Sequence, residues 1–156
     1  MNVGAWLLWG FAGTVALTTI LSASQGLHLT RMNIPFLLGT IFRSGSRSAT
    51  RVGFLVHLAN GWAFALVYVA AFHAWGGATW WRGVAIGIVH ALFVLAGVMP
   101  VLPAFHPRMA SSDEGPMAVR RLEPPGFFAL NYGVRTPVSV IFAHLVFGAI
   151  VGAFYP

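Results

Sequence analysis

Three histidines, His57, His90 and His144, stand inside long apolar stretches of the sequence. Polar side chains at membrane depth cost free energy, so they are the first candidates for a functional role. His57 and His144 are each followed one helical turn later by a glycine, Gly61 and Gly148. Two neutral imidazoles at equal depth on facing helices form the axial pair that a haem b requires, and the glycines would make room for its macrocycle. The sequence thus offers His57 and His144, with His90 nearby, as ligands of a haem or a chlorophyll-type pigment.

Two other uses of these histidines are open from the sequence. Each imidazole could donate a hydrogen bond to a carbonyl or hydroxyl group on the next helix, with Asn60 and Thr14 as partners. The histidines could also form a proton relay or an ion path. A transport pathway ordinarily includes a carboxylate at membrane depth, and none of the apolar stretches contains one. Hydrogen bonding between helices is therefore the simplest expectation, followed by cofactor ligation.

A second group of potential ligands lies in the polar segment 103–137. Its members are His106, Asp113, Glu114 and Glu123. They show no spacing such as His-x-x-x-His, which would place two metal ligands on one helix face. Salt bridges to the arginines of the same segment are the simpler expectation, with Arg108, Arg120 and Arg121 as the available cations. We therefore predict no metal site here.

The same segment is too rich in aromatic residues for a featureless linker. Phe127 and Phe128 follow a Pro-Pro-Gly sequence, and Tyr132 lies shortly after them. We expect these side chains to dock the segment onto the membrane surface or onto a partner. The predicted docking residues are His106, Arg108, Glu123, Phe127, Phe128 and Tyr132.

The composition points to a membrane protein. Of the 156 residues, 58% are hydrophobic and only 8% are charged, whereas soluble domains carry about 25% charged residues. The absence of cysteine excludes disulfides, thiolate metal sites and a cysteine nucleophile. The formal net charge is +6, but the arginines flank apolar stretches and form no basic stripe, so we do not expect a nucleic-acid partner.

Four stretches are long and apolar enough to cross a bilayer, at about 3–27, 52–75, 84–102 and 138–155. None has an Asp, Glu, Lys or Arg in its interior. The first lacks the positively charged start of a signal peptide, so we expect it to be retained. Trp75, Trp80 and Trp81 surround the tight turn after the second stretch, which places this turn at one membrane surface. Tyr155 should end the fourth stretch near the same surface.

The arginines predict the orientation. Eight of the nine lie in the two longer loops, 28–51 and 103–137, and only Arg82 lies on the other side. By the positive-inside rule both loops are cytoplasmic and both termini are periplasmic. In the first loop Asn33 can cap a short interfacial helix with Pro35 in its first turn, and residues 44–48 are expected to form a flexible turn.

The second and fourth stretches share a pattern at a constant offset. The sequence His57-Leu58 with Gly61 and Tyr68 matches His144-Leu145 with Gly148 and Tyr155. The matched residues fall on one helix face, so each helix presents a small and polar stripe to the interior. We predict one all-α domain, 1–156: an integral membrane four-helix bundle built from two similar helical hairpins in parallel orientation.

Several strings of the sequence resemble a known group of proteins. They are MNIPFLLGTIF, HLANGW, HPRMA, LEPPGFFALNYG and HLVFGAIVGAFY, and they extend from Met32 to the C-terminus. The group consists of small bacterial four-helix inner-membrane proteins with no assigned activity. The resemblance implies a topology and a bacterial origin, and it supplies no functional residue.

The function expected from the sequence is that of a non-catalytic accessory or scaffold subunit in a larger bacterial inner-membrane complex. Its partners would be bilayer lipids and other membrane subunits. The alternative is a small membrane cytochrome or pigment-binding protein with His57 and His144 as ligands, and a small transporter is less favoured. An enzyme is least expected, because no nucleophile and base stand at reactive spacing.

Overall fold

The computed structural model describes residues 1–111, 118–119 and 122–156. Within these ranges the chain is helical and has no strand, with a single isolated bridge between Met109 and Leu122. Four helical segments are long and apolar enough to cross a membrane: Val3–Gly26, Ser46–Ala74, Trp80–Phe105 and Thr136–Phe154. The prediction of an all-helical chain with four such helices is confirmed.

Side chains from the preceding loops fix where several helices begin. The Asn2 side chain accepts a hydrogen bond from the Ala5 amide at 3.0 Å and caps α1 (Val3–Gly26). The Asn33 side chain accepts from the Phe36 amide at 3.0 Å and caps α2 (Ile34–Gly39), whose first turn contains Pro35. Because the capped amides lack partners inside the helix, each cap stabilises the first turn. The predicted short helix with its Asn33 cap is confirmed.

Helix α3 (Ser46–Ala74) begins earlier than the predicted apolar stretch. The prediction of a flexible turn over 44–48 is wrong from Ser46 onward, because Gly45 is extended and the helix starts directly after it. Its first turns carry Arg47 and Arg51 and lie beyond the apolar part of the helix. Apolar length alone therefore underestimates this helix.

The third long helix changes its winding in the middle. It consists of α4 (Trp80–Phe93), a π-helical turn η1 (Val94–Val98) and α5 (Met99–Phe105). The Met99 amide donates to the Val94 carbonyl, five residues back. Pro100 has no amide hydrogen and its ring crowds the carbonyl of Ala96, so regular α-helical bonding fails just before it. Such single π turns often occur at functional sites.

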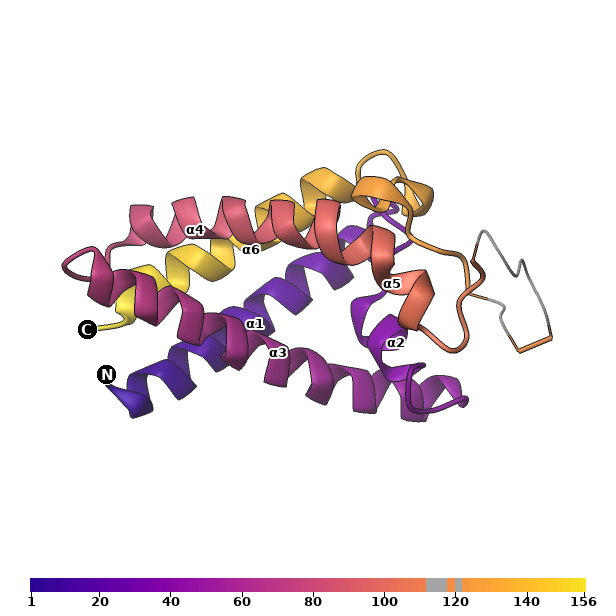
Figure 1. Ribbon diagram of the computed structural model, residues 1–156, viewed down its shortest axis with the longest axis horizontal. Coiled ribbons are helices and arrows are strands. Elements are labelled where there is room, and N and C mark those ends of the chain that lie inside the picture. The colour runs from indigo at the N-terminus through magenta and orange to yellow at the C-terminus, as the bar shows by residue number, and fades with distance from the viewer. Residues whose placement is uncertain (112–117, 120–121) are drawn as a thin grey trace.

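The four long helices form an unevenly packed bundle (Figure 1). Helix α1 packs against both α3 and α6 (Thr136–Phe154), and α4 packs along α6. By contrast, α3 and α4 make few contacts with each other after the turn that joins them. The two termini and this turn lie at one end of the bundle. The opposite end carries α2, α5 and the 3-10 segment η2 (Phe127–Tyr132).

Hydrogen bonds hold the end that contains the termini. The Tyr155 hydroxyl accepts a hydrogen bond from the Asn2 amide at 2.9 Å and lies 3.4 Å from His73 Nε2. His73 belongs to the last turn of α3, beside Trp75. The prediction that Tyr155 lies at the same end as the tryptophan-rich turn is therefore confirmed.

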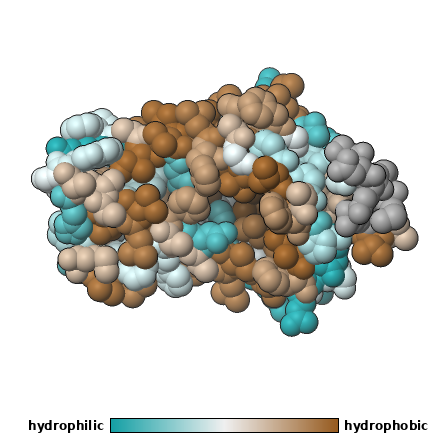
Figure 2. Space-filling view, viewed as in Figure 1, coloured by the Kyte–Doolittle hydropathy of each residue, from teal (hydrophilic) through white to brown (hydrophobic). Residues whose placement is uncertain are grey.

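The outer surface of the long helices is apolar (Figure 2). Large hydrophobic side chains that project outward include Leu8, Leu55, Val67 and Val89, which are 56%, 63%, 57% and 66% exposed. Scattered exposed apolar residues occur on any protein, but large apolar side chains that project from four helices long enough to span a membrane suggest contact with a lipid bilayer.

Candidate functional site

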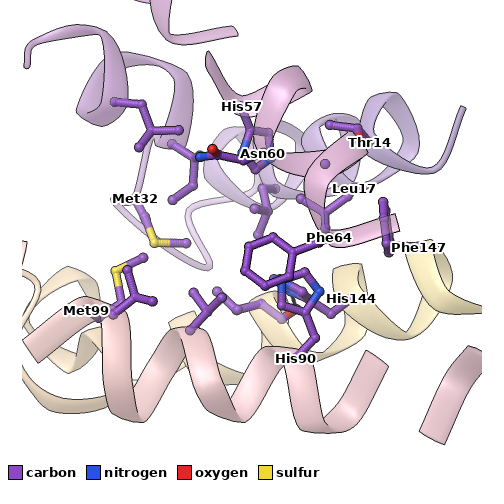
Figure 3. Close-up of a pocket in the computed structure, with 17 residues that line it drawn as sticks. Thr14, Leu17, Met32, His57, Asn60, Phe64, His90, Met99, His144 and Phe147 are labelled. Carbon is purple, nitrogen blue, oxygen red and sulfur yellow. Dashed lines mark hydrogen bonds between the residues drawn. The ribbon is translucent and has the colours of Figure 1, made fainter. Parts of the chain in front are cut away.

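A cavity of about 130 Å³ lies inside the bundle, between the two weakly packed helices (Figure 3). Thr14 and Leu17 of α1 line one wall, and Val140 of α6 lines another. Met32 and Met99 face each other at the end nearest α2. The cavity thus draws side chains from every long helix, which the bundle holds in place.

All three predicted histidines line this cavity. The rings of His90 and His144 meet edge to face, with centroids 4.6 Å apart and planes at 86°. Phe64 stacks on His90 with ring centroids 3.9 Å apart. His57 comes from α3 on the far side of Phe64 (Figure 3). The structure therefore brings His57, His90 and His144 to one site, and their use as cofactor ligands stays a prediction.

His144 is held by its own helix. Its Nδ1 lies 2.8 Å from the Val140 carbonyl oxygen. A carbonyl only accepts, so Nδ1 carries the proton, and in the neutral imidazole Nε2 then carries the lone pair. His144 is 6% exposed, which places a hydrogen-bond acceptor at the cavity wall.

His90 makes the bond between helices that the hydrogen-bonding alternative predicts. Its Nδ1 lies 3.2 Å from the hydroxyl of Tyr68, a residue of α3 that is 1% exposed. Thr14, the hydroxyl partner proposed from the sequence, instead donates to the Gly10 carbonyl at 2.7 Å on its own helix. The predicted type of bond is present, with Tyr68 in place of Thr14.

His57 and Asn60 are the polar groups of the cavity without protein partners. The Nε2 atom of His57 is buried and makes no hydrogen bond to any residue that the structure describes. Asn60 lines the cavity at its exposed edge, and no hydrogen bond joins its amide to the described part of the chain. A buried polar atom without a partner costs about 1–3 kcal/mol, and this cost applies to His57 Nε2. His57 therefore points to a ligand that satisfies it, and the exposed Asn60 offers such a ligand a further hydrogen-bonding group.

The cavity opens sideways, between α3 and α4. Residues of both helices line it, including Phe64 and His90, and the two helices barely touch beyond their connecting turn. The face that shows α3 and α4 in front has a hollow near its centre with hydrophilic atoms inside it (Figure 2). In a bilayer this opening would face lipid, so a ligand would reach the site from the membrane.

A haem does not fit the cavity in this conformation. Pockets for ligands of drug size measure roughly 300–1,000 Å³, and this one measures about 130 Å³. His90 and His144 are in ring contact, so no macrocycle can lie between them. Axial ligation by His57 and His144 would require the opening between α3 and α4 to widen around Phe64, and it stays a prediction.

The predicted docking residues His106 and Arg108 point into the protein. His106 is 2% exposed, and its Nε2 donates to the Leu37 carbonyl at 3.0 Å. Its Nδ1 accepts from the Arg108 amide at 3.2 Å. Burial lowers the pKa of His106, so the imidazole is neutral. The Arg108 guanidinium donates to the carbonyl oxygens of Thr40 and Ile41 at the end of α2.

The later part of the same segment is held in a similar way. Arg31 pairs with Glu123 at 2.9 Å and donates to the Asn131 carbonyl. The Tyr132 hydroxyl donates to the Glu123 carbonyl at 2.6 Å, and burial raises the pKa of Tyr132 to about 12. We call residues 30–43, 106–110 and 122–135 the cap. The side chains of Arg31, His106, Arg108, Glu123 and Tyr132 thus make hydrogen bonds or ion pairs within the cap, through side-chain atoms or, for Glu123, also through its carbonyl.

Other members of the predicted loop sets have different positions. Phe127 is 62% exposed, whereas Phe128 packs against the core. Asp113, Glu114, Arg120 and Arg121 lie outside the described residues. Among the residues that the structure describes, no group of three His, Cys, Asp or Glu could hold a metal. Docking by the loop stays a prediction, carried now by Phe127.

Sequence reasoning missed several residues of the cavity. Phe64, Met32 and Met99 are ordinary apolar residues far apart in the chain, and nothing in their spacing marks them. Tyr68 did carry a signal, because it belongs to the pattern repeated at Tyr155. The π-helical turn had one too, in Pro100 inside an apolar stretch.

No family model matches the chain, and no curated protein or solved structure matches it either. The features of the chain that bear on function are the cavity, its unpartnered polar groups and the opening that leads to it.

Proposed function

We propose that the chain is a four-span membrane protein whose histidine-lined cavity binds a small lipid-soluble ligand. The observation that carries the proposal is the buried His57 Nε2 atom, which has no partner among the described residues and belongs to a residue that lines a cavity with a sideways opening. Inside a bilayer no water is available to satisfy this atom, so the cost of leaving it without a partner is high. A ligand with complementary polar atoms would remove that cost, and the exposed Asn60 amide beside the opening offers it a second hydrogen bond.

The charge distribution supports an orientation with the cap in the cytoplasm of a bacterium and both termini in the periplasm. The arginines of the cap and of the first turns of α3 lie at one end of the bundle, and Arg82 lies at the other. The chain has no cysteine, so single cysteines at Ser44 and Ala74 would report the two sides. A membrane-impermeant thiol reagent should label Ala74→Cys from the periplasm and Ser44→Cys only after the inner membrane is opened. The reverse pattern would invert the topology.

Ligand binding can be tested with two matched variants. Val98 lines the cavity, whereas Val89 points outward and is 66% exposed. We expect Val98→Phe to fill part of the cavity and Val89→Phe to leave it open. Organic extracts of the purified proteins, compared by mass spectrometry, should contain a small molecule with the wild type and Val89→Phe that is lost from Val98→Phe. Equal extracts from all three proteins would refute the proposal.

A visible absorption spectrum decides whether that ligand is a haem or a pigment. Haem ligation predicts a Soret band in the purified protein that His144→Ala removes. A folded, colourless protein that still carries a molecule in the cavity would eliminate the cytochrome and keep ligand binding.

A second candidate function, an accessory subunit of a larger membrane complex, is favoured by the exposed apolar residues of the cap. Phe127, Leu130 and Val134 are 62%, 47% and 82% exposed, next to side chains that are fixed by the internal bonds of the cap. We expect Phe127→Ser to release any subunit that co-purifies after mild extraction, and Val89→Ser on the lipid-facing surface to retain it. Loss of the subunit from both variants, or from neither, would count against docking through the cap.

A further inference from the structure

We infer that the ligand is a single oxygen-bearing six-membered ring, of the quinone, quinol or phenol class, with an apolar tail that leaves between α3 and α4. The inference rests on the proposed ligand binding and specifies its chemistry. It follows from the size of the cavity, the groups on its walls and the direction of its opening.

The size of the cavity selects one ring. An apolar cavity of about 150 Å³ holds a benzene molecule, and this cavity measures about 130 Å³. A tetrapyrrole or a sterol nucleus is several times larger. The part of the ligand that enters is therefore a monocyclic head group.

The apolar walls suit a flat aromatic head. Phe64 and Phe147 offer ring faces and edges, which prefer offset or edge-to-face contact with another ring. Met32 and Met99 close one end, and their flexible thioethers adapt to substituents and pack well against aromatic edges. A saturated chain would gain nothing specific from this arrangement.

The polar groups match oxygen substituents that are neutral. The Asn60 amide can donate to a ring carbonyl, and His144 Nε2 can accept from a ring hydroxyl because its Nδ1 proton is engaged by Val140. His57 Nε2 can serve in either role according to its tautomer. No Asp, Glu, Lys or Arg is among the described residues that line the cavity, so nothing there would compensate a charged ligand.

The opening explains why the ligand would carry a tail. Phe93 is 54% exposed and lies beside Phe64, with ring centroids 6.2 Å apart, so the rim of the opening is itself apolar. A chain attached to the ring would pass over this rim into the lipid. A ring-only metabolite would leave the same rim bare.

Three probes separate these chemistries on the protein in detergent or nanodiscs. 2-Decylhydroquinone has the ring and a tail, hydroquinone has the ring alone, and 1-decanol has the tail alone. We expect 2-decylhydroquinone to bind, hydroquinone to displace it at a concentration about tenfold higher or more, and 1-decanol to leave it in place. Displacement by hydroquinone at equal concentration would overturn the tail, and displacement by 1-decanol as effective as by hydroquinone would overturn the ring.

Matched variants assign the binding to the cavity. Asn60→Leu should weaken 2-decylhydroquinone binding about tenfold by removing the hydrogen bond between the Asn60 side chain and the ring oxygen. Thr19→Val removes a hydroxyl from an exposed position of α1 and should bind like the wild type. Val98→Phe should abolish binding, although it should elute as folded protein like the other two variants. Equal affinity in all variants would overturn the site. A non-aromatic lipid in wild-type extracts that Val98→Phe loses would overturn the ring class alone and leave ligand binding intact.

Discussion

Helices α3 and α6 carry the same pattern of residues, and the glycine of that pattern makes different contacts with α1 (the first pair, α1 with α3) and with α4 (the second pair, α4 with α6). In the second pair Gly148 faces Gly83, and a methyl group on either would overlap the other's backbone carbonyl. In the first pair Gly61 faces the Thr14 side chain instead. The equivalent glycine thus lets two helix backbones touch in the second pair, and in the first pair it contacts a side chain of the neighbouring helix.

Side chains also hold the first pair together in a way that the second does not share. The Trp6 indole donates to the Trp62 carbonyl at 2.9 Å, and the Trp62 indole donates to the Leu7 carbonyl at 2.9 Å. These reciprocal bonds fix α1 and α3 near the termini. Beyond the turn that joins them, α3 and α4 diverge and the cavity lies between them, whereas α4 and α6 stay in close contact. Whether a cavity remains beside a helix therefore depends on which residue of the neighbouring helix the repeated glycine contacts, and not on the repeat alone.

The largest loss of stability should come from a methyl group that obstructs the backbone contact of the second pair. Gly83→Ala places a methyl group on the Gly148 carbonyl, which cannot move aside, so we expect a loss of about 3 kcal/mol in the free energy of unfolding. Gly97→Ala is the control, because the nearest atom to its new methyl is Phe93 Cδ2 at 3.6 Å, an ordinary contact. Denaturation in mixed micelles measures both. Equal stability of the two variants would mean that α4 and α6 are farther apart than described.

The equivalent substitution in the first pair should reduce stability less, and a second substitution should restore part of the loss. Gly61→Ala brings a methyl group onto the Thr14 hydroxyl, and we expect a loss of about 2 kcal/mol. Adding Thr14→Ala removes the obstructing hydroxyl and should recover about half of the loss, as a double-mutant cycle would show. No second substitution of a side chain can rescue Gly83→Ala. Additive losses at Gly61 and Thr14 would erase this difference between the pairs.

The fold was predictable as far as it depends on local patterns. Residues that act over one or two helical turns were enough to predict the four apolar helices, the Asn33 cap and the position of Tyr155. The early start of α3 at Ser46 was missed, because charged residues continue a helix beyond its apolar part. The π turn was missed because Pro100 in an apolar stretch indicates a disturbance without specifying how the backbone resolves it.

The histidines of the candidate site were predictable from the sequence, and their contacts and the apolar residues around them were not. The rarity of polar residues in the apolar stretches selected His57, His90 and His144. Which imidazole bonds to its own helix and which to Tyr68 depends on how the helices rotate and approach each other. That rotation follows from glycine contacts between residues distant in the chain, and one sequence alone does not show them.

The matched tyrosines give the third test. Tyr68 and Tyr155 occupy equivalent places in the pattern, and each hydroxyl lies near a histidine, His90 in one case and His73 in the other. Tyr68→Phe should cost about 1 kcal/mol, since His90 Nδ1 then loses its partner inside the bundle. Tyr155→Phe should cost less than about 0.5 kcal/mol, because its two partners, Asn2 and His73, are exposed residues that water can hydrogen-bond in place of the hydroxyl. A larger loss of stability in Tyr155→Phe than in Tyr68→Phe would mean that the hydrogen bond of Tyr155 contributes more to stability than that of Tyr68.

The cap adds a histidine that neither pair contains. His106 is neutral in the folded protein, since burial lowers its pKa from the ordinary value of 6.5. The unfolded chain then binds a proton more readily, so the stability of the cap is full above pH 6.5 and falls as the pH decreases below it. Cap opening, followed by hydrogen exchange at the Arg108 and Met109 amides, should increase in this range. His106→Gln should flatten the dependence, and an unchanged slope in that variant would assign it to other groups.

The smallest effect should come from the ion pair that links the two helix pairs across the cap. Arg31 follows α1 and Glu123 precedes α6, and their side chains are 66% and 46% exposed. Water and salt screen such a pair, so Glu123→Gln should cost below about 1 kcal/mol and nothing measurable in high salt. Tyr132 bonds to the Glu123 backbone carbonyl, which the substitution keeps, so the cap should stay closed. If Glu123→Gln instead opened the cap at all salt concentrations, the ion pair would contribute more than the buried hydrogen bonds of His106 and Tyr132 to keeping the cap closed.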